Sequence, residues 1–390
     1  MAKIGIYGGT FNPPHLGHIR GASYAKEALG LERVLLLPDR LAPHKDLPET
    51  APTPEQRLEM LRLGIEEAGL EPSDLSLQRE GPTYACDTVA QVRALYPDSE
   101  LFFLLGSDML DNFPNWVNYQ TILEQTTLVV LCRGGKDEAE KLARAKETLG
   151  DKVLALENPI TDISSTQLRR MLMFRCADDF LPWQVAAYIQ RNGLYGVNRN
   201  LRCLPMDKLE QVVVSLLKPN RVAHVLGCRQ TAVELARVYG VDETDAARAA
   251  LLHDITKALD GPLQLTLCQS YGTILDDFSQ KNPKTLHALT GSLVAQRIFG
   301  ENQAVVDAIR CHTTGKADMN TLEKIIYVAD YMEPNRDFPG VDMLRDLAYR
   351  DITKALKLGL QMTLEMLYEQ KRDISPESLE AYYYLKDRGV

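Results

Sequence analysis

The chain has 390 residues, enough for two domains, and its 45% hydrophobic and 25% charged residues are typical of a globular protein. The formal net charge of −9 argues against a general nucleic-acid binder or a protein of anionic membrane surfaces, because both need a basic surface. No run approaches about 18 apolar residues, so we expect no membrane span, and the start KIGIYGG leaves no room for a signal peptide. The seven cysteines include no CxxC pair, so we expect neither disulfides nor a thiolate zinc site. Together these features predict a cytoplasmic protein.

The first half of the chain alternates short apolar runs with helical patterns. Strands are predicted at residues 3–8, 33–38, 74–78, 101–106 and 127–132, and helices at residues 18–30 and 54–69 among others. Such alternation predicts an α/β domain with a parallel sheet and helices on both faces. Ligands of these sheets bind beyond the carboxyl ends of the strands, where the first glycine-rich turn lies.

The second half shows long helical periods and no convincing alternating strand. Helices are predicted around residues 207–217, 229–240, 243–259, 288–299, 322–332 and 351–370. We therefore predict an all-α domain at residues 206–390, separated by a linker at 199–205 from the α/β domain at 1–198.

The stretch GTFNPPHLGH, residues 9–18, joins the first predicted strand to the first predicted helix. Gly8 and Gly9 allow backbone amides to approach a phosphate, and the helix N-terminus that follows favours an anion. His15 and His18 lie three residues apart on one face of that helix start, where two imidazoles suit a phosphate chain better than a core. The stretch predicts a nucleotide-phosphate site.

A second motif, DISSTQLRR at residues 162–170, closes the same half. Serines at a helix start are ordinarily N-caps, but here Arg169 follows one turn later and can reach the same anion. GTFNPPHLGH resembles the (T/S)xxxHxGH signature of the nucleotidyltransferase superfamily, and ISSTQLR resembles its ISSTxxR element. The resemblance implies a Rossmann-like domain whose ATP site comprises Gly8, Gly9, Thr10, Phe11, His15, His18, Ser164, Ser165, Thr166 and Arg169, with His15, His18 and Arg169 catalytic.

Further stretches narrow the resemblance to nicotinate-nucleotide adenylyltransferases over residues 1–196: PDRLAPHK, GPTYACDT, LLGSDMLDNFPNWVNY and AAYIQRNGLY. This family transfers the adenylyl group of ATP, with Mg²⁺ on the triphosphate, to nicotinate mononucleotide, giving deamido-NAD and pyrophosphate. The resemblance places Lys45, Thr83, Asp108, Trp116 and Arg133 around the acceptor nucleotide. Ala85 and Val117 depart from the family pattern where the base is recognised, so the choice between the acid and amide substrates stays open.

The second half holds four histidines, an adjacent His–Asp pair and a late aspartate, namely His224, His253, Asp254, His287, His312 and Asp330. One histidine on a helix is usually a core residue, but this set could bind one metal ion, or two with Asp254 as a bridging carboxylate. Imidazoles and carboxylates without thiolates suit iron, manganese or other borderline divalent ions.

The order H…HD…H…H…D resembles the HD-domain phosphohydrolases. RVAHVLGC, LLHDITK, AIRCHTTG and IIYVADYMEPNRDFPGVD narrow this to the symmetrical bis(5'-nucleosyl)-tetraphosphatases of the HD type, which cut diadenosine tetraphosphate into two ADP. The resemblance implies that the six residues hold two metal ions, with iron expected and Asp254 catalytic. It makes Arg221, Lys257, Thr314 and Arg336 candidates for contacts with the polyphosphate and the nucleoside.

Two alternatives stay open beside this bifunctional interpretation. The first half could use another phosphate acceptor while the second hydrolyses another nucleotide, such as a guanosine alarmone or a cyclic dinucleotide. The helical half could instead be a nucleotide sensor without hydrolase activity. The expected partners are small molecules, with neither nucleic acid nor membrane, and a homo-oligomer is left open.

Overall fold

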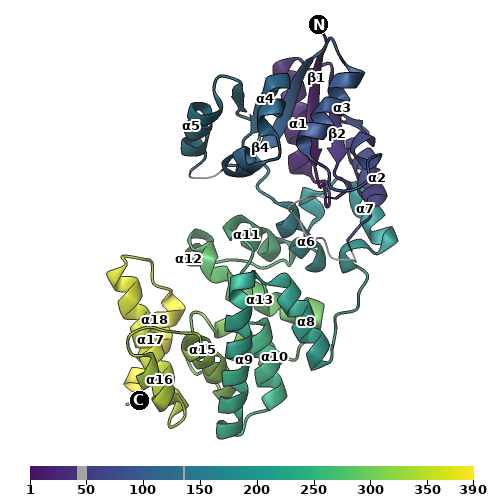
Figure 1. Ribbon diagram of the computed structural model, residues 1–390. Helices are drawn as coiled ribbons and strands as arrows, with labels where there is room; N and C mark the ends of the chain where they lie inside the picture. The colour runs from purple at the N-terminus through teal and green to yellow at the C-terminus, as the bar shows by residue number, and fades with distance from the viewer. Residues whose placement is uncertain (42–50, 135–136) are drawn as a thin grey trace. The chain divides into compact units, whose positions relative to one another are not determined.

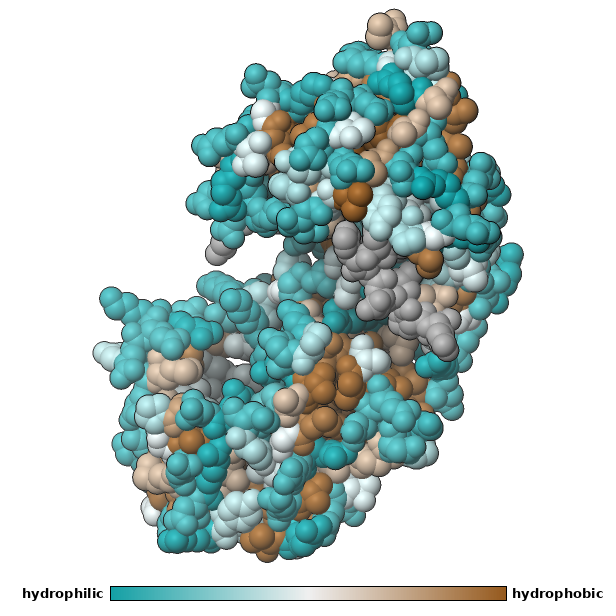
Figure 2. Space-filling view, viewed as in Figure 1, coloured by the Kyte–Doolittle hydropathy of each residue, from teal (hydrophilic) through white to brown (hydrophobic). Residues whose placement is uncertain are grey.

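The structure is a computed structural model that describes residues 1–41, 51–134 and 137–390. It divides into two compact units, Met1–Arg199 and Asn200–Val390 (Figure 1). The first unit is α/β with a parallel sheet and the second is helical, which confirms the predicted fold class. None of the described helices combines the length and apolar character that crossing a bilayer requires. In the view of Figure 2, the surface of each unit is mostly hydrophilic.

Within residues 1–41, 51–134 and 137–199, the sheet of the first unit has six parallel strands in the order β3-β2-β1-β4-β5-β6. The register pairs Ile6 of β1 with Leu35 of β2 and Phe103 of β4. The strands are β1 (Lys3–Gly9), β2 (Arg33–Pro38), β3 (Glu71–Pro72), β4 (Glu100–Gly106), β5 (Thr127–Leu131) and β6 (Val153–Leu156).

Successive residues of each strand pack on opposite faces of the sheet, as the two-residue period requires. Phe102 and Leu104 lie in one buried cluster with residues of α1 (Leu16–Leu29) and α2 (Pro54–Ile65). Phe103 and Leu105 lie in another with residues of α3 (Ala85–Leu95), α4 (Tyr119–Gln125) and α5 (Glu138–Leu149). Both faces are therefore covered, which explains why the strands read as continuous apolar runs.

The strand predicted at residues 74–78 was wrong. Leu75–Leu77 form a short 3₁₀ helix, and the edge strand is the two-residue β3, which no alternation marks. Pro72 has no backbone N–H to give to a ladder, so this strand suits only an edge. The short strand β6 was also not predicted, because only Val153 and Leu156 of its four residues are buried.

The strand order reverses between β1 and β4, and ligands of such sheets bind at this point beyond the carboxyl ends of the strands. The loop after β1 leads into α1 here. A later helix, α6 (Ser165–Met173), begins with Ser165, whose hydroxyl donates to the Pro13 carbonyl of that loop at 3.3 Å. The two motifs recognised in the sequence therefore meet at the carboxyl ends of the central strands. The helix α7 (Trp183–Asn192) follows α6 in the chain.

The second unit is described throughout, and all of its regular elements are helical. In this unit, α9 packs against both α10 and α15. The helices are α8 (Met206–Leu216), α9 (Pro219–Tyr239), α10 (Glu243–Leu252), α11 (Gly261–Ser270), α12 (Asp277–Lys281), α13 (His287–Val294), α14 (Gln303–Cys311), α15 (Thr321–Met332), α16 (Val341–Ala348), α17 (Ile352–Glu369) and α18 (Pro376–Asp387).

The helix predicted at residues 243–259 ends earlier than its apolar pattern suggests. α10 stops at Leu252, and the following residues form consecutive turns in which Ile255 N–H donates to Leu252 O and Lys257 N–H to Asp254 O. These tighter i→i−3 turns carry His253 and Asp254. Likewise α13 ends at Val294 and continues as a π-helical turn over Ala295–Phe299.

Candidate functional site

The loop between β1 and α1 is held in place by side chains from three later parts of the chain. The guanidinium of Arg57, only 1% exposed, donates to the carbonyls of Thr10 and Asp39, both at 2.6 Å. Arg169 donates to the carbonyl of Asn12 at 2.8 Å, and the Tyr195 hydroxyl donates to the Asn12 side-chain oxygen at 2.7 Å. The backbone that would meet a phosphate is thus fixed before any ligand arrives.

His15 and His18 stack at the start of α1, with ring centroids 3.6 Å apart. The backbone N–H of His15 donates to Nδ1 of His18 at 3.3 Å, so a neutral His18 carries its proton on Nε2, as a donor for a ligand. Burial, helped by Arg133, lowers the pKa of His15 to about 3. His15 is therefore neutral at physiological pH.

The start of α6 adds hydroxyls and a cation to the same site. Ser164 caps the helix by accepting from the N–H of Gln167 at 3.2 Å. Arg169 bonds Thr166 Oγ1 at 3.1 Å as well as the Asn12 carbonyl, so its charge lies between the two motifs. A positive helix end beside a guanidinium favours an anion.

These groups line one cavity of about 550 Å³, a size suited to a nucleotide. Of the residues predicted for the nucleotide site, Lys45 falls outside the described residues. All the others line the cavity: Gly8, Gly9, Thr10, Phe11, His15, His18, Thr83, Asp108, Trp116, Arg133, Ser164, Ser165, Thr166 and Arg169. Ala85 and Val117, where the sequence departs from the family pattern, line it too.

The part of the cavity predicted to hold the acceptor nucleotide combines a charged pair with aromatic side chains. Arg133 lies 3.6 Å from the carboxylate of Asp108 and also donates to the Ile163 carbonyl. Trp116 packs against Phe113 and Phe103, and its buried indole nitrogen has no hydrogen-bond partner in the described structure. A flat aromatic surface suits the stacking of a planar ring, and a nearby guanidinium suits a negatively charged substituent on that ring.

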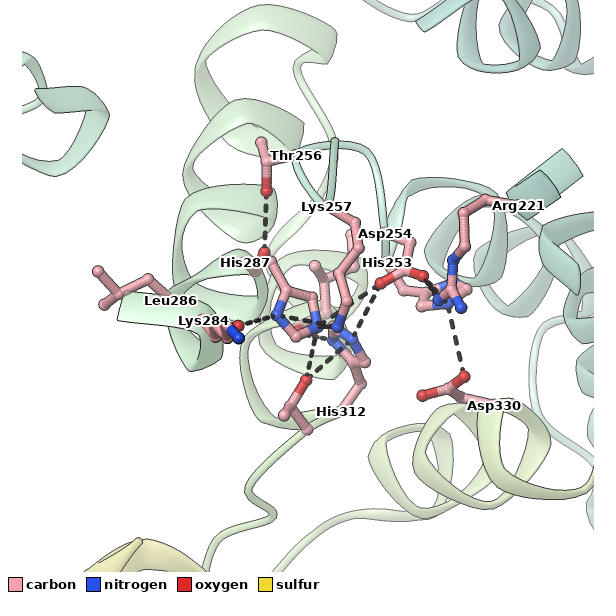
Figure 3. Close-up of polar contacts among 12 residues, drawn as sticks. Arg221, His253, Asp254, Thr256, Lys257, Lys284, Leu286, His287, His312 and Asp330 are labelled. Atoms are coloured by element: carbon pink, nitrogen blue, oxygen red, sulfur yellow. Dashed lines mark hydrogen bonds and ion pairs between the residues drawn. The ribbon is translucent and has the colours of Figure 1, made fainter. Parts of the chain in front are cut away.

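The second unit gathers its four histidines at one point, each with its outer ring nitrogen, Nδ1, beside an acceptor. Figure 3 shows three of them, His253, His287 and His312, together with Asp254 and Asp330. Nδ1 of His253 lies 2.6 Å from Ala250 O, that of His312 lies 2.7 Å from Ile309 O, and that of His287 lies 3.0 Å from Lys284 O. Nδ1 of His224 lies 3.1 Å from a carboxylate oxygen of Glu333. Each acceptor assigns the proton to Nδ1 and leaves the lone pair of Nε2 facing the centre.

The Nε2 atoms converge on two carboxylates. Nε2 of His224 lies 3.0 Å from Asp330 Oδ1, and Nε2 of His253 lies 3.8 Å from the same oxygen. Asp254, 1% exposed, directs Oδ2 toward His224 and His253 at 3.7 and 3.6 Å. Its Oδ1 lies 3.5 Å from His287 and 3.9 Å from His312. Asp254 therefore stands between two histidine pairs, as a bridging ligand would.

The chemistry of this set fits divalent cations. Two acceptor nitrogens, of His224 and His253, face each other at 3.3 Å, an arrangement that repels unless a positive charge lies between them. Burial lowers the pKa of His253 and His287 well below the usual range and that of His312 to about 4, so all three rings are neutral, as a metal ligand must be. Two three-ligand groups meet metal-binding geometry: His224, His253 and Asp330, and His253, Asp254 and His312.

Basic side chains surround this centre. Arg221 contacts Asp254, Arg336 donates to Asp330 at 2.9 Å, and Lys257 lies 2.8 Å from Nε2 of His287. Thr314, the predicted polyphosphate contact, instead donates to Glu377 of α18 at 2.7 Å. Its neighbour Thr313 lies closer to the centre, with its hydroxyl 3.0 Å from His287 and 3.1 Å from His312.

Sequence reasoning missed four residues that organise the two sites: Arg57, Tyr195, Thr313 and Glu333. Glu333 follows Asp330 by three residues, so helical spacing could have indicated it. Thr313 directly follows a proposed ligand. Arg57 and Tyr195 carry no local signal, since they reach the first loop from 47 and 183 residues away.

The comparisons with known proteins agree with this geometry. Residues 6–171 match the cytidylyltransferase-like family and residues 221–335 match the HD domain. A "Probable nicotinate-nucleotide adenylyltransferase" of Bacillus cytotoxicus is 39% identical over 197 residues, covering 50% of this chain and 99% of that protein. One of Listeria monocytogenes is 36% identical over 197 residues, covering 50% and 97%. The first half of the chain belongs to the nicotinate-nucleotide adenylyltransferase family.

The second half carries an HD domain, so the chain is a fusion of the two. A crystal structure from Clostridium acetobutylicum, described as a "predicted HD superfamily hydrolase involved in NAD metabolism", is 38% identical and covers 47% of this chain and 98% of that one, with a TM-score of 0.46. The two family matches confirm the predicted fusion of a nicotinate-nucleotide adenylyltransferase with an HD domain.

Proposed function

We propose that the first unit transfers the adenylyl group of ATP to nicotinate mononucleotide, giving deamido-NAD and pyrophosphate. The observation that carries this proposal is the single cavity lined by both phosphate motifs and by the acceptor residues. The family of the first half supports it. The reaction takes place in the cytoplasm in this proposal.

The residues act by position and charge rather than through a covalent intermediate. His18 donates from Nε2, Arg169 supplies a fixed cation, and the start of α6 presents its amides, so the triphosphate is neutralised along its length. Arg133 and Trp116 hold the acceptor so that its phosphate meets the α-phosphorus of ATP. Alignment of two reactants alone can lower a barrier by about 7–11 kcal/mol. Mg²⁺, which bridges triphosphate oxygens, would enter with ATP.

The test is an acceptor panel with the full chain, ATP and Mg²⁺. Nicotinate mononucleotide, nicotinamide mononucleotide and several phosphates without a pyridine ring are compared by kcat/KM. We expect a clear preference for the pyridine nucleotides. Equal use of all acceptors would contradict the proposal. The ratio between the two pyridine substrates reports what Ala85 and Val117 do to base recognition.

We propose further that the second unit hydrolyses diadenosine tetraphosphate symmetrically to two ADP at a two-metal centre, with iron as the metal. His224, His253 and Asp330 would hold one ion, His287 and His312 the other, and Asp254 would bridge. Two divalent ions would supply an activated water and neutralise the developing charge on phosphorus. Arg221, Lys257 and Arg336 ring the centre and bind the polyphosphate.

The observation that carries this second proposal is the placement of all four histidines around one carboxylate, Asp254, with Asp330 beside His224. A nucleotide sensor would have no need of the complete set. The test uses full-length protein loaded with Fe²⁺ under anaerobic, reducing conditions. ADP as the product of diadenosine tetraphosphate supports the proposal, whereas an intact substrate favours the sensor. If a guanosine alarmone or a cyclic dinucleotide were hydrolysed faster than diadenosine tetraphosphate, that nucleotide would be the substrate instead.

A further inference from the structure

His224 differs from the other three histidines in what holds its outer nitrogen. The others use a main-chain carbonyl three residues earlier in the chain, which is a neutral acceptor. His224 uses the side chain of Glu333, the residue directly after α15, at 3.1 Å. A carboxylate acceptor makes the opposite ring nitrogen a stronger electron donor than a carbonyl does.

The carboxylate of Glu333 is buried and its position is fully determined. It is 1% exposed, and its second oxygen accepts from the backbone N–H and the side-chain amide of Asn335 at 2.7 and 2.8 Å. Within residues 200–390, its only ion-pair partner is His224. Burying a carboxylate costs free energy unless hydrogen bonds and a positively polarised partner stabilise its charge, and Asn335 and His224 are placed to do this.

A glycine in α9 makes room for this carboxylate. Gly227 lies three residues after His224, on the same side of the helix. A Cβ at this position would lie 2.4 Å from Oε2 of Glu333 and 3.0 Å from the amide nitrogen of Asn335. Glycine weakens a helix interior relative to alanine, so its presence here has a packing reason.

We infer that Glu333, seated against Gly227 and Asn335, is a positioning residue that fixes the tautomer of His224 and sets the affinity of one of the two metal ions. This inference rests on the metal centre proposed above. The ion concerned is the one held by His224, His253 and Asp330, because His224 is absent from the second ligand group. The other ion would be held by His312, whose Nδ1 is fixed by a main-chain carbonyl, so its binding should not depend on the charge of Glu333.

The experiment titrates metal-depleted, full-length protein with Co²⁺ alone and follows the visible ligand-field absorption and the number of ions bound. Wild type should bind two ions. Glu333→Gln keeps the shape but removes the charge, and should bind one of the two ions about 10–100-fold more weakly, the usual effect of losing such an outer partner. Gly227→Ala should weaken the binding of the same ion, because the new methyl group displaces the Glu333 carboxylate. The substitution should not weaken α9 itself, since alanine forms helices better than glycine.

The matched control is Glu323→Gln. Glu323 lies at the other end of α15, is also 1% exposed and pairs with Lys316, and none of the four histidines is among its hydrogen-bond or ion-pair partners within residues 200–390. Its variant should bind both ions as wild type does. Equal Co²⁺ affinities in wild type and Glu333→Gln would overturn the inference, and so would an equal loss in Glu323→Gln. Wild type that binds no Co²⁺ would instead overturn the proposed metal centre itself.

Discussion

Replacing Arg57 by methionine should destabilise the first unit through the phosphate loop. Methionine fills a similar volume but cannot donate, so the carbonyls of Thr10 and Asp39 lose their partners at 2.6 Å. Leaving a buried carbonyl without a partner costs about 1–3 kcal/mol. Thr10 is buried and Asp39 is partly exposed, so we expect a total loss of about 2–4 kcal/mol.

For a unit of this size, 1 kcal/mol lowers the melting temperature by about 2–4 °C, so the expected shift is roughly 4–16 °C. Differential scanning calorimetry on the full chain measures it, and the transition of the first unit is the one that ATP raises. Arg62→Met is the control, since Arg62 lies on the same helix with 57% of its side chain exposed. If Arg57→Met and Arg62→Met have the same melting temperature, the stability of the loop does not depend on Arg57. A raised KM for ATP in Arg57→Met alone would accompany the stability loss.

Three further predictions concern the two sites. His18→Ala should lower adenylyl transfer at least 100-fold and spare hydrolysis, while His253→Ala should do the reverse; loss of both activities in either variant would contradict independent sites. Because the pKa of His15 falls to about 3 on folding, its neutral form favours the folded state above pH 6.5, and that contribution declines as the pH falls toward 3. At pH 5 the decline amounts to about 2 kcal/mol, so denaturant unfolding of His15→Gln should show a shallower loss between pH 7 and pH 5. Asp254→Asn should reduce the binding of both metal ions, measured by metal analysis, with adenylyl transfer unchanged; loss of a single ion would show that this carboxylate does not bridge.

The parts of the structure that the sequence predicted well are those set by short-range patterns. The loop GTFNPPHLGH and the serines of ISST each lie within ten residues and resemble known signatures, so the sequence could indicate that both belong to one site, and both line the same cavity. The apolar runs of the central strands, such as LFFLLG, are long because both faces are covered, and this made them easy to recognise. The six candidate metal ligands, singled out by their resemblance to the HD-domain order, come together in the structure, and their role as ligands stays a prediction.

What the sequence did not predict depends on contacts between distant residues. Leu75 and Leu77 alternate with polar neighbours as in a strand, yet they lie in a 3₁₀ turn because Pro72 and Glu71 already form the sheet edge. Glu333 reaches His224 from 109 residues away, and neither residue carries a local sign of the other. The side chains that orient a site are therefore harder to predict than those that would touch its ligand.

Three histidines of the second unit owe their ring orientation to peptide carbonyls at the ends or starts of helices. A peptide carbonyl is present whatever side chain its residue bears. Divergent sequences can consequently preserve the same imidazole angles simply by preserving where α10, α13 and α14 begin or end. Among the acceptors that hold Nδ1 of the four histidines, only Glu333 at His224 is a side chain, so an amino-acid substitution can replace the acceptor itself only there.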